Sequence, residues 1–74
     1  MASFRFESLS DDATWRFVGK EEVHGEMSSR EAFERLAHKQ DLPAGKYRYK
    51  RSDEGASHPP GYFTLAEDGS ITAS

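Results

Sequence analysis

The chain has 74 residues, which suffices for one hydrophobic core rather than two and predicts a single domain over residues 1–74. Its 13 acidic and 10 basic residues give a formal net charge of −3, and its lack of cysteine excludes disulfides and thiolate metal sites. No apolar run approaches the ~20 residues that span a bilayer, and the start of the chain alternates in polarity, unlike a signal peptide. We therefore expect an acidic cytoplasmic protein with no membrane partner, either a monomer or a homodimer.

The N-terminal third predicts a β-hairpin. Residues 4–9 alternate between apolar and polar side chains, which is the period-two pattern of a half-buried strand. A turn follows at residues 10–13, where serine and aspartate side chains can bond to nearby backbone. A second strand starts near Trp15 and extends to about Val23, with Gly19 marking a bulge or a bend.

The middle of the chain predicts a helix over residues 29–40. Ser28 and Glu31 form a capping box, in which each side chain accepts a hydrogen bond from the other residue's backbone N–H. One narrow apolar stripe follows at i, i+3 and i+4: Phe33, Leu36 and Ala37. Pro43 ends the helix, because the residue before a proline is disfavoured in helical geometry.

The C-terminal half predicts three further strands, at about 46–51, 62–65 and 70–72. The loop at 52–61 contains two adjacent prolines, which cannot join a central strand. An Asp-Gly step at 68–69 is typical of a hairpin turn.

These elements predict an α+β two-layer sandwich in β-β-α-β-β order, with one helix packed on a small four- to five-stranded sheet. The pattern leaves the strand order open. The side chains expected under the helix are Phe4, Phe6, Trp15, Phe17, Tyr47, Tyr49, Phe63 and Leu65. Those expected on the opposite side are Arg5, Glu7, Arg16, Lys46, Arg48, Lys50, Tyr62 and Thr64.

The strongest candidate for a binding surface is the basic strand at 46–51, which packs four positive charges into six residues of an acidic protein. Such a face suits phosphates or an acidic protein surface. The partner-binding residues that we predict are Arg16, Lys46, Arg48 and Lys50, with Arg5 and Tyr62 at the margin. The alternative is an ordinary solvated strand whose lysines discourage edge pairing. Because the aromatic residues are expected under the helix, the face does not resemble an RNA-recognition sheet.

Other clusters of polar residues carry weaker signals. The acids between 21 and 34 are a second candidate surface, which would imitate nucleic acid, although solvated helix acids are the simpler interpretation. The three histidines lack metal-ligand spacing, so we expect no metal and no cofactor. No serine has the flanking residues of a nucleophile elbow, and the paired acids lie in turns, so we expect no enzymatic activity.

The sequence therefore favours a small non-enzymatic binding or inhibitor protein that acts through a protein partner. Phage- or plasmid-encoded inhibitors of host nucleases or CRISPR machinery are examples of this class, by analogy of size and charge alone. The alternative is a nucleic-acid-binding module that uses the basic face of the sheet.

Overall fold

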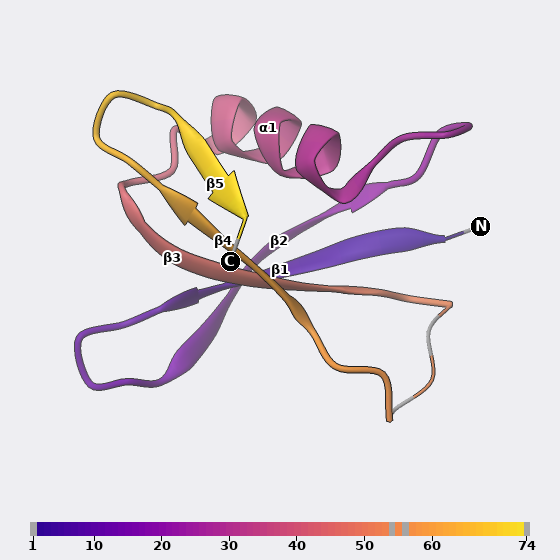
Figure 1. Cartoon of the computed structure of the whole chain (residues 1–74), viewed down its shortest axis with the longest axis horizontal. Coiled ribbons are helices and arrows are strands. Elements are labelled where there is room, and N and C mark those ends of the chain that lie inside the picture. The colour runs from indigo at the N-terminus through magenta and orange to yellow at the C-terminus, as the bar shows by residue number, and fades with distance from the viewer. Residues whose placement is uncertain (1, 54, 56, 74) are drawn as a thin grey trace.

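Five antiparallel strands and one helix make up this protein, in a computed structural model that describes residues 2–53, 55 and 57–73. In chain order the elements are β1 (Ser3–Leu9), β2 (Trp15–Glu22), α1 (Ser29–Gln40), β3 (Gly45–Arg51), β4 (Gly61–Leu65) and β5 (Ile71–Ala73). The helix lies along one side of the sheet (Figure 1). The predicted α+β class with one helix is confirmed.

β1 lies inside the sheet, whose strand order is β2-β1-β3-β4-β5. Both β2 and β3 run antiparallel to β1, so they are parallel to each other and flank it. Two parallel strands need a crossover connection, and α1 supplies it by passing over one face of β1. This connection places the helix against one face only.

The helix begins and ends where the sequence predicts. The Ser28 hydroxyl accepts a hydrogen bond from the backbone N–H of Glu31 at 3.2 Å, which satisfies one of the unpaired donors of the first turn. Asp41 closes the other end in the left-handed conformation (φ 51°, ψ 57°), and its N–H donates to the carbonyl of Ala37. The expected bounds of 29–40 are therefore confirmed.

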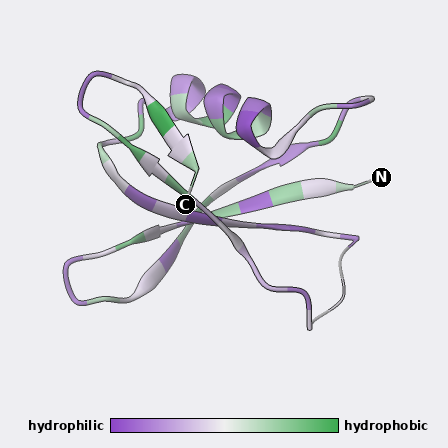
Figure 2. Cartoon of the chain, viewed as in Figure 1, coloured by the Kyte–Doolittle hydropathy of each residue, from purple (hydrophilic) through white to green (hydrophobic). Residues whose placement is uncertain are grey.

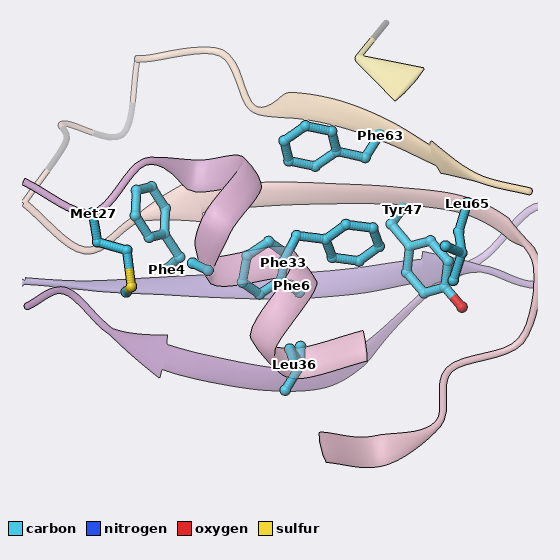
Figure 3. Packing of buried hydrophobic residues seen from close by; sticks show 9 residues of the cluster. Phe4, Phe6, Met27, Phe33, Leu36, Tyr47, Phe63 and Leu65 are labelled. Atoms are coloured by element: carbon cyan, nitrogen blue, oxygen red, sulfur yellow. The ribbon is translucent and has the colours of Figure 1, made fainter. Parts of the chain in front are cut away.

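The core lies between α1 and the sheet and is dominated by aromatic rings (Figure 3). Phe33 of α1 is fully buried, stacks on Phe63 at 5.2 Å between ring centroids, and contacts Phe6 and Tyr47 at 5.4 and 5.0 Å. Figure 2 shows hydrophobic and hydrophilic positions alternating along the turns of α1, as expected for a helix with one buried stripe. The buried residues are Phe4, Phe6, Met27, Ala32, Phe33, Leu36, Tyr47, Phe63 and Leu65.

A β-bulge interrupts the pairing of β1 with β2. Phe6 pairs with Gly19, but the next residue, Glu7, pairs with Phe17, so Val18 is an extra residue on β2. Gly19 takes the position beneath the helix, where an added Cβ would lie 3.0 Å from a methyl group of Leu36. A bulge reverses the in–out alternation of every residue on one side of it.

The bulge corrects three predictions about which way β2 faces. Trp15 and Phe17 were expected under the helix, but they lie on the side of the sheet away from α1, and Phe17 is 54% exposed. Arg16 was expected on that outer side, but it pairs with Ser8, whose other neighbour is the buried Tyr47. Arg16 therefore lies on the helix side, beyond the core.

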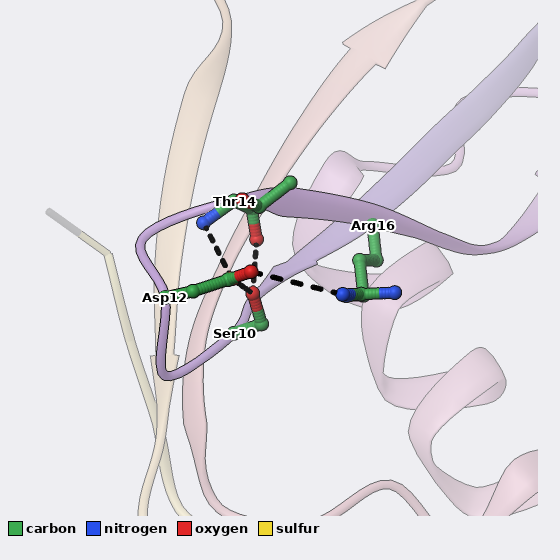
Figure 4. Close-up of polar contacts among 4 residues, drawn as sticks. All are labelled: Ser10, Asp12, Thr14 and Arg16. Carbon is green, nitrogen blue, oxygen red and sulfur yellow. Dashed lines mark hydrogen bonds and ion pairs between the residues drawn. The ribbon is translucent and has the colours of Figure 1, made fainter.

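The turn between β1 and β2 holds Arg16 in a polar cluster (Figure 4). The Ser10 hydroxyl bonds to the Asp12 carboxylate, the N–H of Thr14 donates to the same carboxylate at 3.2 Å, and Arg16 lies 3.8 Å from it. The hydrogen bonds from Ser10 and Thr14 lower the pKa of Asp12. This turn sets the start of β2 and hence the position of Trp15.

Replacing Ser10 with alanine removes the first cause of that shift, so the pKa of Asp12 should rise toward its ordinary value of 3.8. Because the pKa is depressed in the folded state, the stability that Asp12 contributes is present above its unfolded pKa and is lost as the pH falls through the folded one. NMR titration of the side-chain carboxyl carbons measures the change. The Asp68 carboxyl, whose pKa is lowered by Ser70, is the internal control. An Asp12 titration curve that is the same in S10A and in the original chain would contradict this assignment.

Gly61→Ala should destabilise the fold. Gly61 pairs with Tyr49 across the strands, and an added Cβ would lie 2.1 Å from a ring carbon of Tyr49. The ring stacks on Phe63 at 4.9 Å, so its movement disturbs the core, and we expect a loss of about 1–3 kcal/mol in the free energy of unfolding, measured by urea denaturation. At Gly55 an added Cβ meets nothing within 4 Å, so G55A is the matched control, with a change within about 0.5 kcal/mol. Equal stability of the two variants would disprove the close contact.

Candidate binding face of the sheet

The side of the sheet that faces away from α1 is the candidate site, and we call it the open face. The strand register assigns its residues, because side chains alternate between the two sides except at the bulge. They are Ser3, Arg5, Glu7 and Leu9 of β1, Trp15, Phe17, Lys20 and Glu22 of β2, Lys46, Arg48 and Lys50 of β3, Tyr62 and Thr64 of β4, and Thr72 of β5.

Large apolar side chains are exposed on the open face. Phe17 is 54% exposed, Tyr62 41% and Leu9 36%. The rings of Trp15 and Tyr62 approach to 6.0 Å between centroids, although β1 and β3 lie between their strands in the sheet. Leu9, Trp15 and Tyr62 border a hollow of about 280 Å³ together with Lys46.

Two arginines lie on these exposed rings. The guanidinium carbon of Arg5 is 4.5 Å from the ring centroid of Phe17, and that of Arg48 is 4.6 Å from the ring centroid of Trp15. Both distances are within the range of a cation–π contact. Each arginine therefore adds a positive charge over an aromatic ring.

Glu7 anchors the second of these pairs. Its carboxylate accepts a hydrogen bond from Nε of Arg48 at 2.8 Å, and both side chains are about 30% exposed. An ion pair this exposed stabilises the fold by at most about 1 kcal/mol. The ion pair instead fixes the orientation of the Arg48 side chain, which bonds to Glu7 through Nε and contacts the Trp15 ring with its guanidinium group.

Positive charge gathers on the open face in a defined row. Arg5 pairs with Lys20 on one side and with Lys50 on the other, so three cations face one another across three strands. Like charges that face across a sheet are destabilising in the free protein. The face as a whole carries five basic and two acidic side chains, whereas the chain has a net charge of −3. The excess of acids therefore lies in the rest of the chain, much of it in turns and loops, and not on this face.

The structure brings five of the six predicted site residues together on the open face: Arg5, Lys46, Arg48, Lys50 and Tyr62. Arg16 is separated from them by the bulge and is paired with Asp12.

Sequence reasoning placed two residues of this face, Trp15 and Phe17, on the wrong side and left out five more: Ser3, Leu9, Lys20, Glu22 and Thr72. The available signal was Gly19, because a glycine within an otherwise regular strand marks a place where the alternation can change phase. Counting the alternation separately on the two sides of Gly19 would have permitted an outward Phe17.

The other candidate surfaces take on simpler roles. Within the α1 side of the sheet, Glu21 forms an ion pair with Lys39 at 2.8 Å and joins β2 to the helix. Among the described residues no group of three histidine, cysteine or acidic side chains could hold a metal ion. No helix in this part of the chain is long and apolar enough to cross a membrane.

Comparison with protein-family models, curated proteins and solved structures finds no match to the chain.

Replacing Glu7 with alanine should release Arg48 from Trp15. Trp15 is the one tryptophan of the chain, so its fluorescence reports this contact directly. We expect acrylamide to quench E7A more strongly than the original chain, because the guanidinium no longer shields the ring. Glu67→Ala, in the turn between β4 and β5, makes the same charge change away from the open face and serves as the control. Identical quenching in E7A and E67A would show that Glu7 does not position Arg48.

Proposed function

We propose that this chain is a non-enzymatic nucleic-acid-binding protein that acts in the cytoplasm and uses the open face of its sheet. The observation that carries the proposal is the interleaving of exposed aromatic rings with cations on one surface. Binding sites for nucleic acid combine these two groups, since cations neutralise phosphates and aromatic faces stack on bases. In this two-layer sandwich the helix covers one side of the sheet and leaves the other available.

The net negative charge of the chain does not oppose this proposal. The molecule measures 31 × 24 × 19 Å along its principal axes. At physiological ionic strength the screening length is about 8 Å, so acids that lie farther than this from the open face act weakly on a ligand there. The local excess of cations on the open face therefore determines what approaches it.

A second candidate function is the protein-binding inhibitor favoured by the sequence. The exposed Tyr62 and the half-buried Trp15 and Arg48 support it, because these residue types dominate the centres of protein interfaces. Such an inhibitor would occlude the active surface of a larger machine, for example a host nuclease or CRISPR complex. The sequence argued against a nucleic-acid-binding sheet because the aromatic residues were expected under the helix. Trp15 and Phe17 face outward instead, so this argument no longer holds and nucleic acid is favoured over a protein partner.

Fluorescence anisotropy with labelled single- and double-stranded DNA and RNA tests the proposed function. We expect binding that weakens with salt, with a log–log slope of about −2 to −3 for three or four neutralised phosphates of a single strand. The double variant K46E/K50E should lose at least ten-fold in affinity. R30E/R35E on the exposed side of α1 makes the same change in net charge, removes the exposed ion pair of Arg30 with Glu34, and should bind normally.

Two results would overturn the proposed function. One is the absence of binding to any of the four nucleic acids at low salt. The other is an equal loss of affinity in K46E/K50E and R30E/R35E, which would show that net charge matters and the open face does not. Either result leaves the inhibitor candidate, which predicts that the chain slows DNA cleavage by a partner nuclease at stoichiometric concentration.

A further inference from the structure

The open face is organised in rows that differ in chemistry, and this order points to the kind of nucleic acid that it binds. The first row is cationic and contains Lys20, Arg5 and Lys50 in direct register. The next row along the strands brings Phe17 beside β1 and Tyr62 beside β3. Trp15 lies two residues before Phe17 on the same strand. A ligand that spans these rows contacts lysine and arginine side chains at one end and aromatic rings at the other.

We propose that the open face binds a single strand of nucleic acid and stacks two of its bases, one on Phe17 with Arg5 and one on Trp15 with Tyr62 and Arg48. This inference rests on the proposed function and adds to it the strandedness of the ligand and the mode of contact. The cationic row then neutralises the backbone phosphates on the side of Phe17.

The stacking surfaces exclude a duplex. Inside a double helix the faces of the bases are covered by their neighbours, so a side chain can stack on a base only where the strand is unpaired. Phe17 is 54% exposed and Tyr62 41%, and their rings project from the strands of a sheet rather than from a helix that fits a groove. The open face therefore offers its largest contact area to separated bases.

The spacing of the two platforms supports the same conclusion. Residues i and i+2 of a strand lie about 7 Å apart, so Trp15 and Phe17 are separated by roughly twice the 3.4 Å rise between stacked bases of one duplex strand. Bases seated on both platforms cannot remain stacked on each other. Binding thus selects an extended strand whose bases are already apart.

Each platform already carries a planar cation. The guanidinium of Arg5 lies on Phe17, and that of Arg48 lies on Trp15, where Glu7 holds it. A guanidinium plane stacks on bases as an aromatic ring does, and it also attracts phosphate. An acidic protein partner would need aromatic side chains placed beside its carboxylates to use both the arginines and the rings, whereas every nucleotide carries a phosphate and a planar base.

The test compares a labelled single-stranded 12-mer with a hairpin duplex of the same base composition, in DNA and in RNA versions. Phe17→Ala should lower affinity for the single strand by about ten-fold or more, because stacking contributes about 1–3 kcal/mol per base. It should change affinity for the duplex by less than two-fold, and it should leave the salt slope for the single strand unchanged, since no charge is removed. His38→Ala removes an exposed ring from α1, on the other side of the sheet, and it is the matched control.

A second readout separates stacking from general loss of structure. Addition of the single strand should quench Trp15 fluorescence in the original chain, and the duplex should not. Lys20→Gln should reduce the salt slope for the single strand by about 0.7, the contribution of one phosphate contact, while quenching at saturation persists. Circular dichroism checks that each variant folds. Preference for either DNA or RNA is compatible with the proposal, because stacking and phosphate contacts are common to both.

The outcomes distinguish failure of this inference from failure of the proposed function. If single strand and duplex bind equally well and F17A affects them equally, the open face binds nucleic acid but not by stacking, and this inference is overturned. If neither binds, the proposed function itself fails. If a polyglutamate peptide displaces the single strand at an equal concentration of charge, charge alone governs the face, and the protein-binding candidate replaces it.

Discussion

The β-bulge at Val18 is the constraint on which the remaining features depend. One extra residue on β2 keeps Gly19 beneath the helix and turns Phe17 to the opposite side of the sheet. Without the extra residue, the register that pairs Leu9 with Trp15 would set Val18 opposite Phe6. A side chain there would collide, because a Cβ at the position of Gly19 lies 2.7 Å from Nε2 of Gln40 and 3.0 Å from a methyl group of Leu36. The bulge therefore lets α1 approach β2 closely at Gly19 while Trp15 and Phe17, on its other side, face away from the helix.

The consequence is a division of the aromatic residues into two sets with different roles. Phe33 joins the inner set by contacting rings from β1, β3 and β4, so a short helix with one apolar stripe suffices to close the core. The outer set contains Trp15, Phe17 and Tyr62, which are partly or largely exposed and contact arginines or one another. A domain with so few aliphatic residues thus uses aromatic rings both to fold and to present a surface.

Local signals accounted for the elements but not for the faces of β2. The capping residue Ser28 and the apolar stripe around Phe33 act within one turn or two of the chain, so the helix was predictable. The basic residues of β3 were also placed correctly, because Tyr47 is buried and its neighbours must face outward. The bulge arises from the pairing of β2 with β1 and from the proximity of Leu36, which are tertiary contacts. Arg16 was misplaced and Phe17 was missed for that one reason.

The open face concentrates features that are unfavourable in the free protein. Phe17 leaves more than half of its surface in water, and Arg5 faces two further cations across the strands. Either feature alone is common on protein surfaces, but here they share one face of a small domain whose remaining charge is negative. A ligand that is both flat and anionic relieves the two costs at once, because it covers the rings and neutralises the row. Functional surfaces typically contain features that destabilise the free protein, and binding of the right ligand offsets them.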